Sequence, residues 1–386
     1  MRSRKVCVVL TTRGNYAKMK NVITEIDAHP NLQLQVVVGG GLVLEKYGRI
    51  LDDDVTKNIV ADRSVFFVVE GENPLTMAKS AGLAVSEFAT AFSELQPDVV
   101  VVIADRFECL AVAMAAAYMN IPVAHVEGGE VSGSIDESIR HAITKLAHIH
   151  FPASVDAKER IINLGEREET VFCVGASSID ALCEVNLADL TAVNNFCQTH
   201  GVGAKQQFQI RDYLLVIQHP VTTEYQENYH NIRETIAAIS HLGRPTVWIW
   251  PNMDAGSDGV SKAIREFRES GQADNVYFFK SLPIEIFGPL LKNASCILGN
   301  SSSGVREAAF LGTPSVNIGV RQNGRYRGDH VVDVDYDKEQ IIDAVEKQSA
   351  SGSYPPDYGY GQGGSAKEMV RRLAEEKILV QKTISF

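Results

Sequence analysis

The sequence predicts an α/β protein with two doubly wound, Rossmann-like parallel sheets and a cleft between the two domains. Short β-branched runs alternate with segments of helical period, which is typical of a parallel sheet covered by helices. The run DVVVVIA at 98–104 is apolar on both faces, as an interior parallel strand requires. After residue 182 the pattern becomes polar and irregular, and it restarts near residue 205, which predicts a second domain.

Six strand-like runs define the first predicted domain, residues 1–182. They lie at 5–10, 32–38, 65–69, 98–104, 121–126 and 170–175. Helices are expected at 17–29, 83–95 and 107–119. The amino-terminal MRSRKVCVVL is basic and then apolar, but its apolar part is too short for a signal peptide, so we interpret it as the first strand.

The second predicted domain, residues 205–365, repeats the alternation. Strands are expected at 213–218, 246–250, 275–279, 296–299 and 315–319, and helices at 264–270, 286–294 and 305–312. The glycine- and proline-rich stretch 352–364 is expected to be a loop. Residues 365–381 have the pattern of one amphipathic helix.

Composition excludes several classes of function. The 386 residues carry a net charge of −11, which disfavours binding to nucleic acid, so an anionic ligand needs a local positive site. The six cysteines form no CxxC pair and lie mostly in apolar runs, which indicates free thiols in a reducing cytoplasm. No stretch approaches the roughly 20 apolar residues of a membrane span.

Ligands of open α/β sheets bind at the carboxyl ends of the strands. The segments that follow predicted strands are 12–15, 105–106, 125–130, 218–220, 252–257 and 299–304, and all are polar or small. Their recurrence in both halves predicts that they serve one shared site.

The first candidate site contains four carboxylates: Asp105, Glu127, Glu130 and Asp136. Carboxylates gathered near one site favour general acid–base chemistry, and their mutual repulsion raises some of their pKa values. Helix capping by Asp136 or Ser134 is the alternative interpretation. The expected helix 137–148 carries Arg140, His141, Lys145 and His148, which add positive charge to the site and pair with the carboxylates; routine ion pairs on a solvated helix are the alternative. The histidines show no metal-ligand spacing, so no metal is expected.

The second candidate site is the run LGNSSSGVREAAFLG, where a strand, a serine-rich turn and a helix follow one another. Such a helix start binds phosphate, so Ser301, Ser302 and Gly304 are expected to contact a diphosphate and Glu307 to accept from ribose hydroxyls. A capped helix without a ligand is the alternative. Isolated polar residues at other strand ends complete the set, with arginines suited to a diphosphate: Arg13, Arg106, His219, Asn252 and Arg321.

Together these segments resemble the hydrolysing UDP-N-acetylglucosamine 2-epimerases of bacterial sialic-acid pathways and of the epimerase half of the bifunctional vertebrate enzyme. The resemblance rests on DRFECLA, HVEGGEVSGSIDESIRHAITKLAH, QHPVTT, PNMDAGS, GNSSSGVRE and RQNGR, which occur in the family's order. The middle segment separates the chain from non-hydrolysing relatives, which carry an HVEAGLR-like run there. Asn15 and Ala17 depart from the family's first loop, where relatives have an acidic and a hydroxyl residue.

The resemblance implies a GT-B fold and a carboxy-terminal helix, 366–386, that packs back toward the first domain. It implies a homodimer or homotetramer, for which the apolar residues of 43–50 are a weak hint. By analogy Asp105, Glu127, Asp136 and His219 are catalytic. The residues implied to hold the UDP-sugar are Arg13, Arg106, Glu130, Asn252, Ser301, Ser302, Gly304, Glu307 and Arg321.

The implied reaction releases UDP and N-acetylmannosamine through 2-acetamidoglucal, and needs no cofactor because no net redox change occurs. Which carboxylate is base and which is acid stays open, with Asp105 or Glu127 favoured as base and Asp136 as acid. Three alternatives remain. They are the same chemistry on UDP-2,4-diacetamido-2,4,6-trideoxy-glucose for legionaminic-type sugars, a GT-B glycosyltransferase, and a non-catalytic sugar-nucleotide binder.

Overall fold

The computed structural model describes residues 3–44, 60–71, 73–203, 212–251 and 256–385. The chain forms two compact units. Unit 1 comprises Met1–Val131, Ile135–Cys183 and Gly359–Phe386, and unit 2 comprises Ser132–Ser134 and Glu184–Tyr358. The short segment 132–134 groups with unit 2, where the Gly133 N–H donates to the Arg321 carbonyl at 3.4 Å.

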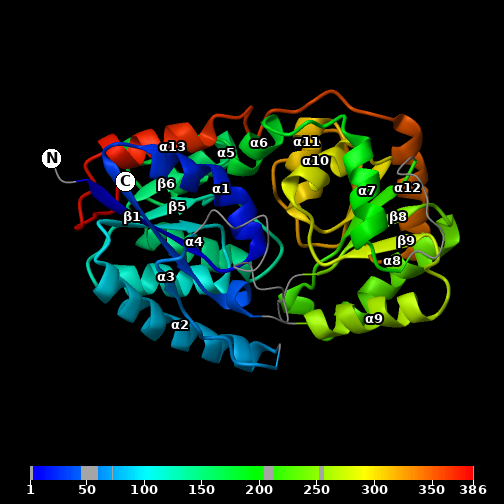
Figure 1. Ribbon diagram of the computed structural model, residues 1–386, viewed down its shortest axis with the longest axis horizontal. Coiled ribbons are helices and arrows are strands. Elements are labelled where there is room, and N and C mark those ends of the chain that lie inside the picture. The colour runs from blue at the N-terminus through cyan, green and yellow to red at the C-terminus, as the bar shows by residue number, and fades with distance from the viewer. Residues whose placement is uncertain (1–2, 45–59, 72, 204–211, 252–255, 386) are drawn as a thin grey trace. The chain divides into compact units, whose positions relative to one another are not determined.

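Unit 1 is built on a six-stranded parallel sheet in the order β3-β2-β1-β4-β5-β6 (Figure 1). Its strands are β1 Arg4–Leu10, β2 Leu32–Val38, β3 Arg63–Ser64, β4 Val99–Ile103, β5 Val123–Val126 and β6 Ile149–Phe151. The strand order reverses direction between β1 and β4, which pair in register with Val8 opposite Val101. In a doubly wound sheet the ligand crevice forms at this switch point.

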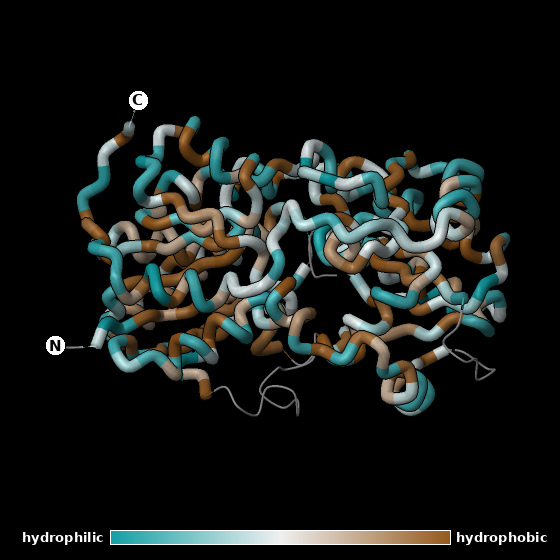
Figure 2. The backbone as a smooth tube through the Cα atoms, turned by 90° about the horizontal axis from the view of Figure 1, so that it is seen from above, coloured by the Kyte–Doolittle hydropathy of each residue, from teal (hydrophilic) through white to brown (hydrophobic). Residues whose placement is uncertain are grey.

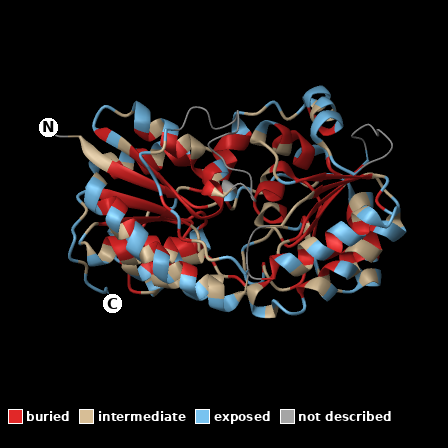
Figure 3. Ribbon diagram, turned by 60° about the horizontal axis from the view of Figure 1, so that its bottom comes forward, coloured by how far each residue is buried: buried red, intermediate tan, exposed pale blue. Residues whose placement is uncertain are grey.

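Helices cover both faces of the first sheet because successive side chains of a strand point to opposite sides. Helices α1 Arg13–Ala28 and α13 Ser365–Glu375 pack with Val6, Val8 and Leu10 of β1, while α2 Pro74–Leu95, α3 Phe107–Tyr118 and α4 Asp136–Leu146 pack with Cys7 and Val9. Two shorter helices, α5 Val155–Asn163 and α6 Ser177–Cys183, complete unit 1. Figure 3 shows the resulting buried strands and the exposed outer surfaces of the helices.

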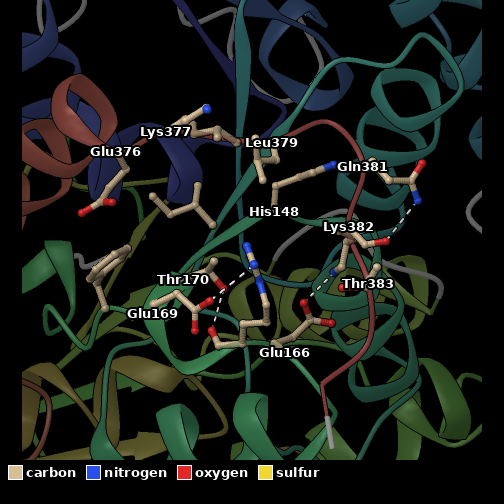
Figure 4. A pocket seen from close by; sticks show the side chains of 14 residues that line it. His148, Glu166, Glu169, Thr170, Glu376, Lys377, Leu379, Gln381, Lys382 and Thr383 are labelled. Atoms are coloured by element: carbon tan, nitrogen blue, oxygen red, sulfur yellow. Dashed lines mark hydrogen bonds and ion pairs between the residues drawn. The ribbon is translucent and has the colours of Figure 1, made fainter.

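The predicted helix over 365–381 is longer than the observed helix α13, because the tail that follows α13 is not helical. The helix ends at Glu375, and residues 376–385 continue outside any helix or strand. Tertiary hydrogen bonds hold this tail instead: His148 Nε2 donates to the Val380 carbonyl at 2.9 Å, and the Ser385 N–H to Gly165 at 2.8 Å. A cavity of about 40 Å³ lies beneath it, with His148 and Lys382 among its lining residues (Figure 4).

Unit 2 repeats this topology with six parallel strands in the order β12-β11-β10-β7-β8-β9. The strands are β7 Leu214–Ile217, β8 Thr246–Ile249, β9 Val276–Phe279, β10 Cys296–Gly299, β11 Ser315–Ile318 and β12 Val331–Val334. Its helices are α7 Leu190–His200, α8 Asn228–Leu242, α9 Ser257–Glu269, α10 Ile284–Asn293, α11 Glu307–Leu311 and α12 Lys338–Ser351. The switch point lies between β7 and β10.

One face of the second sheet is covered by α8, α9 and α12, and the buried Trp248 and Phe267 are in ring contact there. Tyr213, just before β7, donates its hydroxyl hydrogen to the Leu290 carbonyl of α10. The hydropathy colouring of Figure 2 shows hydrophobic segments gathered in the interior of the trace and hydrophilic segments mostly toward its outside. No helix among the described residues is both long and apolar enough to cross a bilayer.

The predicted α/β fold with two doubly wound sheets is confirmed, with local differences. The strand expected at 65–69 is instead the two-residue β3, and the run at 170–175 makes only an isolated bridge between Val171 and His150. Both lie at sheet edges, where few ladder hydrogen bonds fix a strand. The structure adds β6 and β12, which the sequence interpretation missed. It also places α7 inside the segment interpreted as irregular.

Candidate active site

The end of β1 leads directly into helix α1 at the switch point of unit 1. The Thr12 side chain caps the helix by accepting from the Asn15 N–H at 3.1 Å, and the Thr11 hydroxyl donates to Asn15 Oδ1 at 2.9 Å. Asn15, one of the departures from the resembled family, is therefore buried in the turn itself. Arg13 is the first residue of α1, and its side chain lies outside the described part of the structure.

Asp105, directly after β4, pairs with Arg140 of α4. The Arg140 guanidinium is almost wholly buried and also donates to the Glu130 carbonyl oxygen at 2.8 Å. Burial alone would lower the pKa of Arg140, but the Asp105 and Glu130 carboxylates outweigh it and raise that pKa, so the group stays a cation. One arginine thus orients two of the predicted carboxylate residues.

Glu127, at the end of β5, is buried and forms an ion pair with Lys18 of α1, with 2.7 Å between Nζ and Oε2. Its backbone lies in the left-handed region at φ 59°, as does that of Ala104 at φ 65° after β4. Such a conformation costs a residue with a side chain about 1–3 kcal/mol and is enriched at functional sites. Two neighbouring strand ends of unit 1 therefore carry backbone strain beside carboxylates.

Asp136 is the first residue of α4, and Ile135 occupies the N-cap position without a side-chain cap. Asp136 therefore lies inside the helix and does not occupy its N-cap position. A carboxylate in the first helical turn is favoured by the helix dipole. Asp136 is half-buried, and Glu130, six residues earlier, is buried.

Arg106 folds back onto Glu108, and its Nε lies 3.2–3.3 Å from both carboxylate oxygens. Glu108 is fully buried in the first turn of α3, which explains the pairing. A role for Arg106 in holding a diphosphate stays a prediction. On α4, His141 lies 3.6 Å from Glu137, and burial lowers its pKa.

The serine-rich loop after β10 lies at the switch point of unit 2. It begins at Gly299 with φ 124°, where a Cβ atom would lie 2.1 Å from the Ile217 carbonyl oxygen, so only glycine fits. The Ser301 side chain accepts from the Ser303 N–H at 3.3 Å, and the Gly304 N–H donates to the Ser301 carbonyl at 3.1 Å. The turn Ser302–Gly304 is a 3₁₀ helix, labelled η6, and α11 has only five residues. Its dipole is thus weaker than the sequence interpretation assumed.

Asn300 holds the backbone of His219. Its Oδ1 accepts from the His219 N–H at 2.7 Å, and its Nδ2 donates to the His219 carbonyl at 2.8 Å. Arg321 and Gln322 both donate to the Asn300 carbonyl, at 3.2 and 2.8 Å. Asn300 therefore links the end of β7 to the Arg321 loop within unit 2.

Glu307, the first residue of α11, is buried, and its Oε2 has no hydrogen-bond partner among the described residues. A buried unpaired acceptor is costly, so this carboxylate suits a donor supplied by a ligand. Ser301 and Ser302 are half-buried in the same loop. Asn252 lies outside the described residues.

Two further predictions concern ions and assembly. Within the described ranges, no three His, Cys, Asp or Glu side chains converge in a way that would hold a metal ion. Of the segment 43–50, which hinted at oligomerisation, Val43 is buried and Leu44 half-buried, while residues 45–50 lie outside the described part. The oligomeric state stays a prediction.

The sequence interpretation did not assign roles to Lys18, Asn300 or Gln322, whereas it expected Arg140 to pair with the carboxylates, as Arg140 does with Asp105. Lys18 lies one helical turn beyond Asn15, so the helical period after the first strand could have placed it at the site. Asn300 lies within the GNSSSG run that was singled out for its serines. The partners of these residues come from other strands or helices, and helical period does not predict such contacts.

A family model described as UDP-N-acetylglucosamine 2-epimerase matches residues 24–374, most of the chain and both candidate sites. The chain belongs to this family. A UDP-N-acetylglucosamine 2-epimerase from Neisseria meningitidis serogroup B is 30% identical over 372 residues, which cover 96% of this chain and 94% of that protein. A UDP-N,N'-diacetylbacillosamine 2-epimerase (hydrolyzing) from Legionella pneumophila is 32% identical and covers 96% and 95%.

The family's fold is seen in a solved structure. The crystal structure of UDP-GlcNAc 2-epimerase from Neisseria meningitidis, bound to UDP-GlcNAc, superposes with a TM-score of 0.77 at 21% identity. It covers 96% of this chain and 100% of that one. The two parallel six-stranded sheets with flanking helices are thus the GT-B-like fold of these epimerases. The fold class that the sequence predicted is confirmed.

Proposed function

We propose that the chain is a hydrolysing UDP-N-acetylglucosamine 2-epimerase, which converts UDP-GlcNAc and water to N-acetylmannosamine and UDP. Membership of the epimerase family and the carboxylates at the strand ends of unit 1 support this reaction. The observation that carries it is the pair of cation-bound carboxylates, half-buried Asp105 with Arg140 and buried Glu127 with Lys18. The product would serve sialic-acid-type sugar biosynthesis.

The first half of the proposed reaction is an elimination. A carboxylate base, Asp105 or Glu127, takes the C2 proton as the C1–O bond to UDP breaks, and the two C–H and C–O electron pairs become the C1=C2 double bond and the UDP oxyanion. The products are 2-acetamidoglucal, UDP and a protonated carboxyl group. Arg140 and Lys18 lie beside these two carboxylates and hold their side chains in place.

The second half is a hydration with the opposite stereochemistry at C2. A carboxylic acid, for which Asp136 is the favoured residue, protonates C2 on the other face while the oxygen of a water molecule adds at C1. The water gives its proton to the carboxylate left by that acid, and the base of the first step releases its proton to solvent. Proton transfer by a positioned carboxyl group contributes about 10²–10⁴ to a rate. Asp136 is half-buried at the first turn of α4, where it is accessible and rigidly held.

The uridine diphosphate is assigned to unit 2. Glu307 is proposed to accept from ribose hydroxyls because its buried Oε2 has no protein donor in the described structure. Hydroxyls of Ser301 and Ser302, together with Arg321 and the Gly304 amide, are proposed to hold the phosphates. His219 is held by Asn300 and is proposed to protonate or bind the leaving diphosphate.

The test is to incubate the protein with UDP-GlcNAc in deuterated water and to identify the products by NMR. We expect free UDP and N-acetylmannosamine carrying one deuterium at C2. Retention of the original hydrogen at C2 would reject the proton transfer. Formation of UDP-N-acetylmannosamine, with the bond to UDP intact, would reject hydrolysis.

A second candidate substrate is UDP-2,4-diacetamido-2,4,6-trideoxy-glucose, for a legionaminic-type pathway. Two relatives support it by name, from Legionella pneumophila and, at 29% identity, from Campylobacter jejuni, because diacetylbacillosamine carries acetamido groups at C2 and C4. The reaction at C1 and C2 is the same for both sugars. Measurement of kcat/KM for both sugar nucleotides distinguishes the two candidate substrates. A higher kcat/KM for the diacetamido sugar would make it the proposed substrate in place of UDP-GlcNAc.

A further inference from the structure

The side chain of His125 lies buried at the centre of the β5 strand, two residues before Glu127. Its ring contacts two elements of unit 1: Nε2 lies 2.8 Å from the Ala104 carbonyl oxygen after β4, and Nδ1 lies 3.2 Å from the Thr144 hydroxyl of α4. The side chain has no solvent exposure. The imidazole thus bridges the strand end that bears Asp105 and the helix that bears Arg140.

These two contacts fix the protonation of the ring. A carbonyl oxygen only accepts hydrogen bonds, so Nε2 must carry the hydrogen and donate to Ala104. In the neutral ring Nδ1 is then an acceptor, and the Thr144 hydroxyl donates to it. Burial lowers the pKa of His125 to about 3, so the ring stays neutral over the working range of pH. Both nitrogens are already used within the protein.

The peptide that His125 holds is the strained one. Ala104 has φ 65°, and its N–H donates to the Val126 carbonyl at 2.9 Å, so His125 completes the fixation of this residue by holding its carbonyl. Asp105 follows immediately, and its carboxylate meets Arg140. Release of the Ala104 carbonyl would let this residue relax toward an unstrained conformation and turn Asp105 away from its place.

The surroundings leave the ring no alternative position. A Cβ atom at Gly128 would lie 2.7 Å from His125 Nδ1 and 3.1 Å from the Thr144 hydroxyl, so the glycine makes room for this contact. Charged groups near the ring include Arg140, Asp105 and His150. The ring is enclosed by protein and does not provide a binding surface.

We propose that His125 is a positioning residue, which holds the left-handed Ala104 peptide through Nε2–H and thereby sets the orientation of Asp105 for proton transfer. This proposal depends on the proposed function, in which Asp105 is a candidate catalytic base. It assigns His125 neither a proton-transfer step nor a ligand. A displacement of about 1 Å in a reacting group lowers a rate on the order of 10²-fold, so loss of this hydrogen bond is expected to reduce kcat.

The test compares His125→Gln with His125→Met in the full chain. Glutamine keeps a donor for the Ala104 carbonyl and an acceptor for Thr144, whereas methionine fills similar space with neither. We expect His125→Met to lower kcat about 100-fold with KM and UDP affinity nearly unchanged, and His125→Gln to restore at least about a tenth of the wild-type kcat. Equal kcat values for the two variants, or an unchanged kcat in His125→Met, would overturn the proposal.

A second measurement reports on the ring in the wild-type protein and does not depend on catalytic activity. In ¹⁵N-histidine-labelled protein, long-range ¹H–¹⁵N spectra report which ring nitrogen carries the hydrogen. We expect a neutral Nε2–H ring for His125 that does not titrate between pH 5 and 8, assigned by its loss in His125→Gln. An Nδ1–H ring, or titration near neutral pH, overturns the proposal. If the wild-type protein turns over neither sugar nucleotide, the proposed function fails, and the ring measurement still decides the geometry.

Discussion

The Lys382 ammonium of the carboxy-terminal tail lies 2.6 Å from Glu166 Oε2 and also donates to the Ala147 carbonyl at 2.6 Å and the Lys145 carbonyl at 2.9 Å. Its three hydrogens are therefore directed at the last carbonyls of α4 and at one buried carboxylate. A cation at a helix carboxyl terminus is stabilised by the helix dipole. The tail thus anchors the end of the helix whose first turn bears Asp136.

Replacement of Lys382 by methionine is expected to destabilise unit 1. Glu166 keeps Lys145 and His150 as partners, so the loss is that of charge-assisted hydrogen bonds, about 1.5–3 kcal/mol. Thermal unfolding should therefore show a lower midpoint. Lys377→Met is the matched control, because Lys377 is exposed on the same tail and the charge change is identical. Equal midpoints for the two variants would show that the Lys382 contacts contribute nothing.

Stability is expected to fall as the pH falls below neutral. Hydrogen bonds from His150, Lys145 and Lys382 lower the pKa of Glu166 to about 2, against the opposing effect of burial. Since the unfolded state binds this proton first, the stabilisation by Glu166 is complete above about pH 4.5 and is lost as the pH falls toward 2.

Burial lowers the pKa of His125 to about 3. This shift also makes the folded state less stable as the pH falls, over a higher range of pH than the shift of Glu166. In the folded protein the buried ring stays neutral. In the unfolded chain the ring binds a proton once the pH falls below the ordinary histidine pKa of 6.5. This difference removes about 2 kcal/mol of stability by pH 5. Chemical unfolding at pH 7.5 and pH 5 measures it, and His125→Gln, which cannot titrate, should lose less. An equal loss in the variant contradicts the prediction.

The sequence predicted the central strands of the two sheets more accurately than the edge strands. Central strands such as β4 are apolar on both faces, and this pattern is independent of their neighbours. The edge strand β3 and the tail depend on contacts that no local pattern encodes, such as the hydrogen bond from His148 to Val380. The conformation of the edge strands and of the tail therefore cannot be predicted from local sequence patterns.

The same distinction applies to the candidate site. The rule that ligands bind at strand ends selected Asp105 and Glu127, because it depends only on where a strand stops. It could not identify Lys18 as the partner of Glu127, since Lys18 comes from α1. The charged residues of the predicted helix 137–148 did indicate Arg140 as a partner for the carboxylates. The left-handed conformation of Glu127 was equally hidden, because glutamate has no preference for it.

Asp105→Asn and Glu127→Gln are each expected to lower kcat by about 10²–10⁴ while UDP affinity changes little. Each change keeps the shape of the side chain but removes the basic oxygen. Glu94→Gln on α2, which breaks an exposed pair with Arg63, is the control and should leave kcat intact. Turnover is followed by UDP release, and UDP affinity by calorimetry. Full turnover in both site variants would show that neither carboxylate is the base, whereas UDP-sugar binding without turnover in the wild-type protein would favour the non-catalytic binder.

Gly299→Ala is expected to disrupt the loop that carries Asn300. The added Cβ atom would lie 2.1 Å from the Ile217 carbonyl, and φ is 124°, so β10 and β7 must move apart. Backbone strain and overpacking together cost about 3 kcal/mol or more. Because Asn300 holds His219 and accepts from Arg321, UDP affinity should fall as well.

Gly243→Ala at the end of α8 is the control for the effect of backbone strain alone. Its φ is 60°, but a Cβ atom there meets nothing within 4 Å, so the cost is limited to about 1–2 kcal/mol. UDP affinity should be unchanged, because Gly243 lies at the C-cap of α8, away from the serine-rich loop. The two variants are compared by thermal unfolding and by calorimetric UDP titration. Equal UDP affinity in both would show that the close contact at Gly299 does not position the loop for the nucleotide.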